Sequence, residues 1–263
     1  MARNAASTWL AFMRFTKGSI ELSPAQDMPL LRQVLHSQFI THDQLFEFMD
    51  IGNYERKRPS FNWRVRRLVE HEFLGRYYFP EIDPSYLYRI GSRCSGLIEF
   101  APFLPMRSRR PVVEPRLCGH WIELNKIHLS LARHPGLLKE WLSETAIVSR
   151  NLLTTFGYAK DYDAVVTLSV EGRPFTFALE YEQSAKGKAA YMDIQDRLES
   201  EQQVKRFLYL ASSENLLSFL THCFASIRAG LYLGLAREFV ASPLETPVFD
   251  AFSRKRTVFR NAL

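Results

Sequence analysis

Cysteine is scarce in this sequence, and its few cysteines are far apart. Cys94, Cys118 and Cys223 are the three among 263 residues. They provide neither a disulfide framework nor the close paired spacing of a zinc site. We therefore expect reduced, structural thiols, as in a cytoplasmic protein.

Long apolar runs are missing as well. A helix that crosses a bilayer takes about 20 apolar residues, and no uninterrupted run reaches that length. The apolar patch from Trp9 to Phe15 is interrupted by Arg14, and no small-residue cleavage site follows it. We expect a soluble protein without a membrane partner. The sequence also matches no P-loop, dinucleotide-binding fingerprint or nucleophile elbow, so the enzyme classes that use them have little support.

Negative charge is outnumbered by positive charge. There are 34 lysines and arginines against 28 aspartates and glutamates, which gives a formal net charge of +6. This excess favours a polyanionic partner, although a ribosomal, nucleic-acid-binding or membrane-surface protein fits the balance equally. With 46% hydrophobic and 24% charged residues, the chain is long enough for one large or two ordinary globular domains.

The first half of the chain contains a series of short helical patterns. After an N-terminal arm, residues 1–27, Thr41 and Gln44 form a capping-box pair and Ser60 marks another helix start. Two aromatic-rich runs, 74–79 and 86–90, predict a hairpin. Three helices followed by such a hairpin predict a winged helix-turn-helix domain. The apolar residues that recur at helical spacing are Leu31, Val34 and Leu35, then Leu45, Phe48 and Met49, then Phe61, Val65 and Leu68.

Basic residues gather at the third predicted helix. Arg64, Arg67 and His71 lie three to four residues apart and turn away from the apolar face. A basic, exposed helix face is what groove binding and phosphate neutralisation require, so this unit predicts binding to double-stranded DNA. The alternatives are a solvated face and a protein–protein module. The candidate DNA-binding residues are Arg56, Lys57, Arg58, Asn62, Arg64, Arg66, Arg67 and Arg76.

A segment rich in proline and arginine separates the two halves. Residues 101–120 contain four prolines and four arginines and show no periodicity. We predict a linker here, between a first domain at 1–100 and a second domain at 121–263. Its arginines either contact phosphates or are merely solvated. They are Arg107, Arg109, Arg110 and Arg116.

The second half alternates helical and strand patterns. Helices are predicted at 121–133, 138–149, 189–203 and 213–223, and a strand at 205–211. A further element is expected at 231–239 and a basic tail at 243–263. His120, His128 and His134 lack metal-ligand spacing and are expected to be core or surface histidines. Strand, helix and strand in this order predict a parallel crossover, and hence an α/β domain with a mixed sheet.

The most informative stretch is 161–188, DYDAVVTLSVEGRPFTFALEYEQSAKGK, which predicts a hairpin. With Gly172 and Arg173 as the turn residues, Asp163 lies opposite Glu182. Because side chains alternate along a strand, Asp163, Glu180 and Glu182 then share one face. Directly opposed Cβ atoms are roughly 5 Å apart, which is close enough for the carboxylates to share one cation.

Carboxylates placed this close repel one another unless a cation, a proton or nearby basic groups compensate. Lys186 and Lys188 follow within a few residues. Hard oxygen ligands suit Mg²⁺, which is the candidate cofactor. The alternative is a solvated acidic strand end without a metal, because the sharing of one face depends on the register that the turn sets.

This pattern resembles the PD-(D/E)xK restriction-endonuclease-like superfamily, in which an Asp on one strand and an acidic-x-Lys on the next hold a divalent metal for phosphodiester hydrolysis. The resemblance implies Asp163, Glu180 and Glu182 as metal ligands and catalytic residues. The chain departs from the pattern because it has Glu182 where the superfamily has Lys. Either Lys186 or Lys188 takes the catalytic role of that lysine, or the fold is kept and the chemistry is lost.

Most of the chain, from Leu30 to Cys223, resembles the plasmid replication-relaxation family, also called MobC-like, of bacterial mobile elements. The resemblance implies a DNA-binding winged helix fused to a restriction-endonuclease-like domain. In the nuclease-like superfamily a helix before the first core strand often supplies an extra catalytic acid, and Glu144 is the candidate for it. Members commonly have Glu-x-Asp where this chain has Glu180-Tyr181-Glu182, which also lacks the lysine. The segments that carry it are the winged helix, CGHWIELNKIHLSLAR, WLSE at Trp141–Glu144, DAVVTL from Asp163, and ALEYEQSAKGKAAYMDIQDRL.

We therefore expect a DNA-binding protein of a bacterial mobile element or defence system, which acts in replication, transfer or transcription control and carries a degenerate nuclease-like domain. The first alternative is a Mg²⁺-dependent DNA endonuclease or nickase that uses Asp163, Glu180 and Lys186. The second is a protein-binding adaptor in a mobile-element or anti-phage complex. The expected partners are double-stranded DNA and either a second copy of the chain or a mobile-element protein complex.

Overall fold

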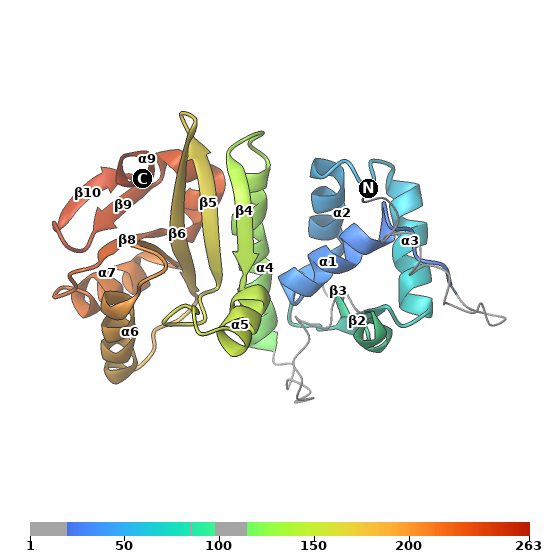
Figure 1. The fold of residues 1–263 in the computed structure, drawn as a ribbon, viewed down its shortest axis with the longest axis horizontal. Helices are drawn as coiled ribbons and strands as arrows, with labels where there is room; N and C mark the ends of the chain where they lie inside the picture. The colour runs from blue at the N-terminus through green and yellow to red at the C-terminus, as the bar shows by residue number, and fades with distance from the viewer. Residues whose placement is uncertain (1–19, 85, 98–114) are drawn as a thin grey trace, which may run out of the picture.

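The computed structural model describes residues 20–84, 86–97 and 115–263, which form a small N-terminal unit beside a larger sheet (Figure 1). The three helices and the hairpin expected from the sequence are present in the N-terminal unit. Its strands pair antiparallel in the order β1–β3–β2. Residues 101–114 of the predicted linker, with Arg107, Arg109 and Arg110, lie outside the described residues, as do residues 98–100. The elements of this unit are α1 (Asp27–Ser37), β1 (Ile40–Thr41), α2 (His42–Ile51), α3 (Arg58–Glu70), β2 (Leu74–Tyr78), β3 (Tyr86–Ile90) and the 3-10 helix η2 (Ser92–Gly96).

Local sequence explains where the helices of this unit begin. Thr41 Oγ1 accepts a hydrogen bond from the backbone N–H of Gln44, and Gln44 Oε1 accepts one from the N–H of Thr41, both at 3.2 Å, so the predicted capping box is confirmed. Helix α3 begins before the predicted Ser60, because Pro59 occupies its first turn, where a missing N–H costs nothing. The completely buried core residues include Leu30, Val34, Leu45, Phe61 and Leu68.

Helix α4 (Pro115–Ala132) is shared by the two halves of the molecule (Figure 1). It begins inside the predicted linker, so residues 115–120 are helical and the predicted end of the linker is wrong. On one side, Asn125 Nδ2 donates a buried hydrogen bond of 2.8 Å to the backbone oxygen of Phe39. On the other side, Ile127 and Leu131 pack into the core of the sheet. The helix therefore joins the N-terminal unit to the sheet.

The C-terminal part is a seven-stranded sheet in the order β10–β9–β8–β7–β6–β5–β4. Its members are β4 (Leu138–Ser143), β5 (Ala164–Val170), β6 (Arg173–Glu182), β7 (Arg206–Ala211), β8 (Gly230–Leu235), β9 (Pro247–Asp250) and β10 (Lys255–Val258). β6, β7 and β8 are parallel and the other neighbours antiparallel, which confirms the predicted crossover and mixed sheet. One face packs on α5 (Glu144–Leu153), α6 (Lys188–Ser200) and α7 (Glu214–Cys223), the other on α4, α8 (Ala236–Ala241) and α9 (Phe259–Ala262).

Residues 138–149 form a strand and then a helix rather than the single predicted helix. Strand β4 pairs antiparallel with β5, with Trp141 opposite Val166. Trp141 also stacks on His128 of α4, with ring centroids 4.1 Å apart. The apolar spacing of the segment fits a helix, and only the neighbouring strand and His128 make it an edge strand.

No helix in the described part of the chain combines the length and hydropathy needed to cross a membrane.

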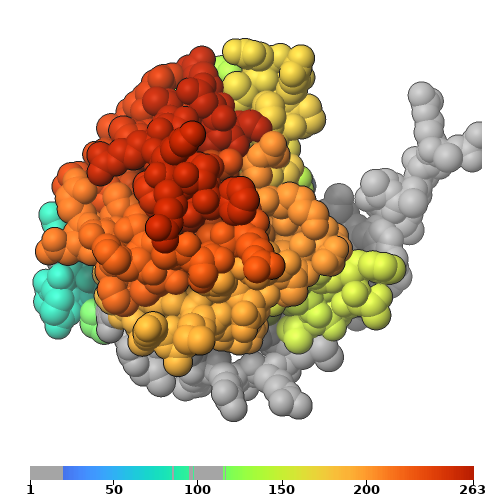
Figure 2. Space-filling model, turned by 90° about the vertical axis from the view of Figure 1, so that its left-hand side faces the viewer, coloured from blue at the N-terminus to red at the C-terminus, as the bar shows by residue number. Residues whose placement is uncertain are grey.

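Residues 243–263 complete the sheet and are not the predicted basic tail. They contain the 3-10 helix η4 (Pro243–Glu245), the hairpin β9–β10 and α9. Phe259, 1% exposed, lies 5.2 Å from the ring centroid of Phe177 and 5.6 Å from that of Phe239. Figure 2 shows this segment packed on the residues that precede it. The basic residues of this segment predict a tail, whereas its apolar residues Phe259 and Ala262 are buried in the core of the sheet. The element expected at 231–239 is likewise β8 followed by the start of α8.

The turn between β5 and β6 comes one residue earlier than predicted. Its two residues are Glu171 and Gly172, with φ of 52° and 78°, and Val170 pairs with Arg173. Two-residue hairpin turns of this kind need positive φ at both central positions, which Gly172 adopts without strain. A glutamate in the left-handed region is uncommon, which is why the sequence favoured a different turn.

Candidate functional site

Three carboxylates lie at one end of the β5–β6 hairpin. Asp163 directly precedes β5, and Glu180 and Glu182 are near the end of β6. Because Ala164 pairs with Leu179, Asp163 lies beside Glu180 and not beside Glu182 as predicted. The register differs from the predicted one by two residues, so the three side chains still share a face.

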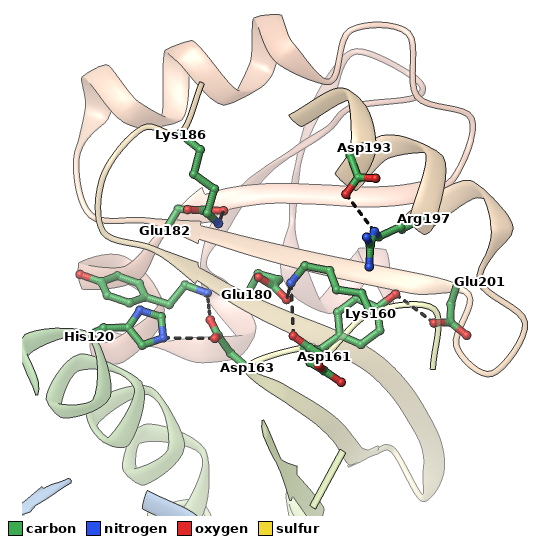
Figure 3. A network of polar contacts seen from close by, with 12 residues as sticks. His120, Lys160, Asp161, Asp163, Glu180, Glu182, Lys186, Asp193, Arg197 and Glu201 are labelled. Atoms are coloured by element: carbon green, nitrogen blue, oxygen red, sulfur yellow. Dashed lines mark hydrogen bonds and ion pairs between the residues drawn. The ribbon is translucent and has the colours of Figure 1, made fainter. Parts of the chain in front are cut away.

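Each of these carboxylates has a basic partner from a different segment (Figure 3). Asp163 Oδ1 lies 3.1 Å from His120 Nε2 of α4, and its Oδ2 accepts a 2.7 Å hydrogen bond from the N–H of Tyr181. Glu180 Oε1 pairs with the ammonium group of Lys160, in the loop before β5. Glu182 Oε1 pairs with Lys186 Nζ at 2.5 Å. Protein cations therefore compensate all three negative charges.

Burial and neighbouring charges shift the proton affinities of the cluster. Burial, together with the negative charge of Asp163, raises the pKa of Glu180 to about 7, against the opposing effect of Lys160. Burial would raise the pKa of Asp163, but the hydrogen bond and charge of His120 outweigh it and lower that pKa. The pKa of His120 is raised because the hydrogen bond and charge of Asp163 outweigh its own burial.

The structure brings Glu144 and Lys186 to the cluster but not Lys188. The backbone N–H of Glu144, the first residue of α5, donates a 3.0 Å hydrogen bond to the backbone oxygen of Asp163. Burial and then the charge of Asp163 raise the pKa of Glu144. Lys188 is the first residue of α6 and is exposed, and no ion pair joins it to a described acid.

Two residues of the cluster escaped the sequence analysis. Lys160 precedes Asp163 by only three positions, so it could have been counted among the compensating cations. His120 is 43 positions from Asp163, and no local spacing links the two. Only the position of α4 against the sheet brings His120 to this carboxylate.

The predicted metal ligands do not fit a divalent cation in this arrangement. Within the described ranges, no group of three His, Cys, Asp or Glu side chains could hold a metal ion. Lys160 forms an ion pair with Glu180, and His120 forms one with Asp163. These basic groups occupy the positions at which a cation would need to bind. Mg²⁺ would have to displace basic groups that already satisfy the carboxylates. The hydroxyl of Tyr209, the residue opposite Glu180 on β7, is buried without a described hydrogen-bond partner.

A second feature is the exposed side of α3, which we call the α3 face: Arg56, Lys57, Asn62, Trp63 and Arg66. All five side chains are exposed, and Trp63 is 54% exposed. The guanidinium carbon of Arg67 lies 4.9 Å from the centroid of the Trp63 ring. The α3 face therefore combines positive charge with an exposed aromatic ring.

Arg64 is buried, contrary to the prediction that it lies on an exposed basic face. It is 6% exposed, and its Nη1 lies 2.7 Å from Oδ1 of the fully buried Asp27. The other oxygen of Asp27 pairs with Arg67, and Glu55 lies 3.6 Å from Arg64 Nη2. Arg64 and Arg67 do share one side of α3, but that side packs on the start of α1. Arg64 is therefore not available for a phosphate.

The other predicted DNA-binding residues differ in how free they are. Arg58 pairs with Asp43, and its guanidinium lies 4.7 Å from the centroid of Phe46. Arg56 donates a hydrogen bond to Asn53. The side chains of Lys57, Arg66 and Arg76 are exposed and form no ion pair with any residue that the structure describes.

Comparisons with known proteins assign no family. No protein-family model matches the sequence, and no curated protein matches it. The structure of restriction endonuclease FokI is similar with a TM-score of 0.27 and 10% identity, over 85% of this chain and 45% of that one. The chain thus spans less than half of that structure, and a likeness this weak carries no argument. Membership of the replication-relaxation family stays a prediction.

Proposed function

We propose that this protein binds double-stranded DNA through its N-terminal unit, and that the sheet domain is a nuclease-like body that does not cleave DNA. The order α1–β1–α2–α3–β2–β3 matches that of a winged helix, in which the third helix enters the major groove. The α3 face belongs to that helix and to the segment before it, which supports the same role.

The observation that carries the DNA-binding proposal is the unpaired positive charge around α3. Lys57, Arg66 and Arg76 are exposed and lack an ion-pair partner in the described part of the chain. Several exposed arginines of the sheet domain, in contrast, are neutralised by nearby acids. These pairs are Arg197 with Asp193, Arg237 with Glu214, and Arg260 with Glu245. Unpaired surface cations are the groups that displace counterions from DNA phosphates.

The test is the salt dependence of binding to a labelled duplex. Each phosphate contact contributes about −0.9 to the slope of log affinity against log salt concentration. Arg66→Ala should weaken binding and reduce the magnitude of that slope by about 1. Arg173→Ala removes the same charge at the exposed β5–β6 turn and should change neither quantity. Affinity that does not respond to salt, or equal effects of both variants, would contradict the proposal.

The proposed loss of cleavage is supported by the ion pairs of the acidic cluster. A metal-dependent hydrolase offers carboxylate oxygens to a cation, whereas Asp163, Glu180 and Glu182 each hold a basic residue of the protein. The position of the superfamily lysine is Glu182, whose own charge needs Lys186. We expect supercoiled plasmid to stay intact with Mg²⁺ or Mn²⁺. Cleavage by the parent that Asp163→Ala abolishes would establish the nuclease alternative instead.

Protein binding is a second candidate function, because one apolar patch is strongly exposed. Leu152 and Leu153 at the end of α5 and Phe156 after it are 77%, 64% and 74% exposed. Neighbouring exposed apolar side chains of this size are typical of association surfaces. If this patch joins two copies of the chain, Leu153→Lys should convert a dimer to a monomer in light scattering. A parent that is monomeric at all concentrations would exclude that use.

A further inference from the structure

The end of the β2–β3 hairpin carries an aromatic pair that the fold does not need. Tyr78 and Tyr86 are the last pair of the ladder, and their side chains are 59% and 50% exposed. Their ring centroids lie 5.1 Å apart with the planes tilted by 47°. The hairpin is held in place by other side chains, since Leu74 is 1% exposed and Leu87 is 0% exposed.

A cation completes this group. Arg76 precedes Tyr78 by two residues on β2, so the two side chains point to the same face of the hairpin. The guanidinium carbon of Arg76 lies 5.1 Å from the centroid of the Tyr86 ring. No described acid forms an ion pair with Arg76, which leaves its charge available to a ligand. We call Arg76, Tyr78 and Tyr86 the hairpin triad.

We propose that the hairpin triad stacks on unpaired bases, so that the protein prefers DNA with an opened or bulged segment over a fully paired duplex. This inference rests on the proposed DNA binding and names the form of DNA that is recognised. Exposed tyrosine rings offer flat faces to bases, and the neighbouring arginine attracts the phosphate that follows. In a closed duplex the base faces are covered by their neighbours, so only unpaired bases can use both rings.

The alternative use of such rings is the binding of a protein partner, but the charge favours DNA. Two residues of the α3 face, Lys57 and Arg66, lack ion-pair partners in the described chain in the same way as Arg76. A duplex held by α3 and an unpaired segment held by the hairpin would then be two parts of one continuous polyanion. An acidic protein would gain from the charge without gaining from the two exposed ring faces.

The experiment compares a blunt duplex with the same duplex carrying a bulge that contains 2-aminopurine, whose emission falls when it stacks. The parent protein should bind the bulged DNA roughly tenfold more tightly, which corresponds to stacking of about one base. It should also quench the probe. Tyr78→Ala combined with Tyr86→Ala should lose the preference and the quenching, and keep the affinity for the blunt duplex within about twofold.

Two controls separate stacking from other effects. The double Tyr→Phe variant keeps the rings and should keep the preference. Phe252→Ala removes an aromatic that is 66% exposed in the β9–β10 turn and should change nothing. If the parent binds both DNAs equally, or if the double alanine variant keeps the preference, this inference is overturned while duplex binding stands. If the parent binds neither DNA, the proposed function fails together with it.

Discussion

At the scale of single residues, Glu180 is the most informative group of the sheet domain. Its carboxyl is 4% exposed and shares its surroundings with Asp163 and the paired Lys160. Burial raises its pKa from an ordinary value of 4.5 to about 7, so the native protein holds a proton there that the unfolded chain releases. Above that pKa the carboxyl is ionised, and Lys160 compensates its charge.

The contribution of Glu180 to stability should fall as pH rises from 4.5, because Glu180 gives up its extra proton between its unfolded pKa of 4.5 and its folded pKa of about 7. The loss from this residue should reach about 3 kcal/mol by about pH 8. Burial lowers the pKa of His128 to about 3, so His128 adds stability as pH rises toward 6.5 and offsets Glu180 over that range. His120, whose folded pKa is also raised, adds stability that is complete below 6.5 and lost as pH rises through the folded pKa. Asp163, whose pKa is lowered, acts in the opposite sense, and only as pH falls below 3.8.

Urea denaturation at a series of pH values measures this effect. The stability of the parent minus that of Glu180→Gln should fall as pH rises from 4.5 to about 8, because an amide cannot titrate and the other groups act equally in both proteins. The exposed Glu214, which pairs with Arg237, provides the matched control, and the difference between the parent and Glu214→Gln should not change over this pH range. A difference between parent and Glu180→Gln that does not change with pH over this range would show that Glu180 is ionised in the native state.

At the scale of single elements, sequence patterns predicted what depends on near neighbours. The Thr41–Gln44 capping box, the helices of the N-terminal unit and the β6–α6–β7 crossover all follow from local spacing. The burial of Arg64 does not follow from local spacing, because its partner Asp27 is 37 positions away. Helical periodicity cannot show which side of a helix packs on another helix. The β5–β6 register depended on Glu171 adopting a positive φ, which its residue type disfavours.

The candidate site was predicted in the same partial way. Asp163, Glu180 and Glu182 were found because strand alternation fixes which carboxylates share a face, even when the register is two residues away. Their compensation by His120 was missed, because it requires the position of α4 against the sheet. The sequence left Mg²⁺, a proton and nearby basic groups as possible compensation for the acids. The identity of a compensating cation is a tertiary property that a strand pattern does not contain.

The two arginines Arg64 and Arg66 on α3 should behave in opposite ways. Arg64→Ala leaves buried Asp27 with one cation fewer and should lower the free energy of unfolding by about 3 to 5 kcal/mol. Arg66→Ala removes an exposed, unpaired charge and should change stability by less than about 0.5 kcal/mol. Chemical denaturation of both variants checks this. Equal and small effects would mean that Arg64 is not held as a buried ion pair.

At the scale of the whole molecule, α4 makes the two halves one cooperative body. Its hydrogen bonds to the N-terminal unit include Gln44 Nε2 to the backbone oxygen of Ile122, at 2.8 Å. Leu129 of the same helix lies in the core of the N-terminal unit, and Leu131 lies in the core of the sheet. His120 extends the connection to the acidic cluster. If the N-terminal unit binds DNA as proposed, this connection holds the sheet domain at a fixed position relative to the duplex.

Loss of one buried hydrogen bond between α4 and the N-terminal unit should therefore destabilise both halves of the molecule together. Asn125→Ala leaves the backbone oxygen of Phe39 without its donor and should cost about 1 to 3 kcal/mol. Hydrogen exchange should then show equal losses of protection in α2 and in β7, because α4 must open before either core does. Lys126→Ala changes the next residue, which is exposed and pairs only with Glu123, and should leave exchange in both elements unchanged. Loss of protection in α2 alone would mean that the N-terminal unit opens independently, and a rigidly placed sheet domain would no longer follow from the shared helix.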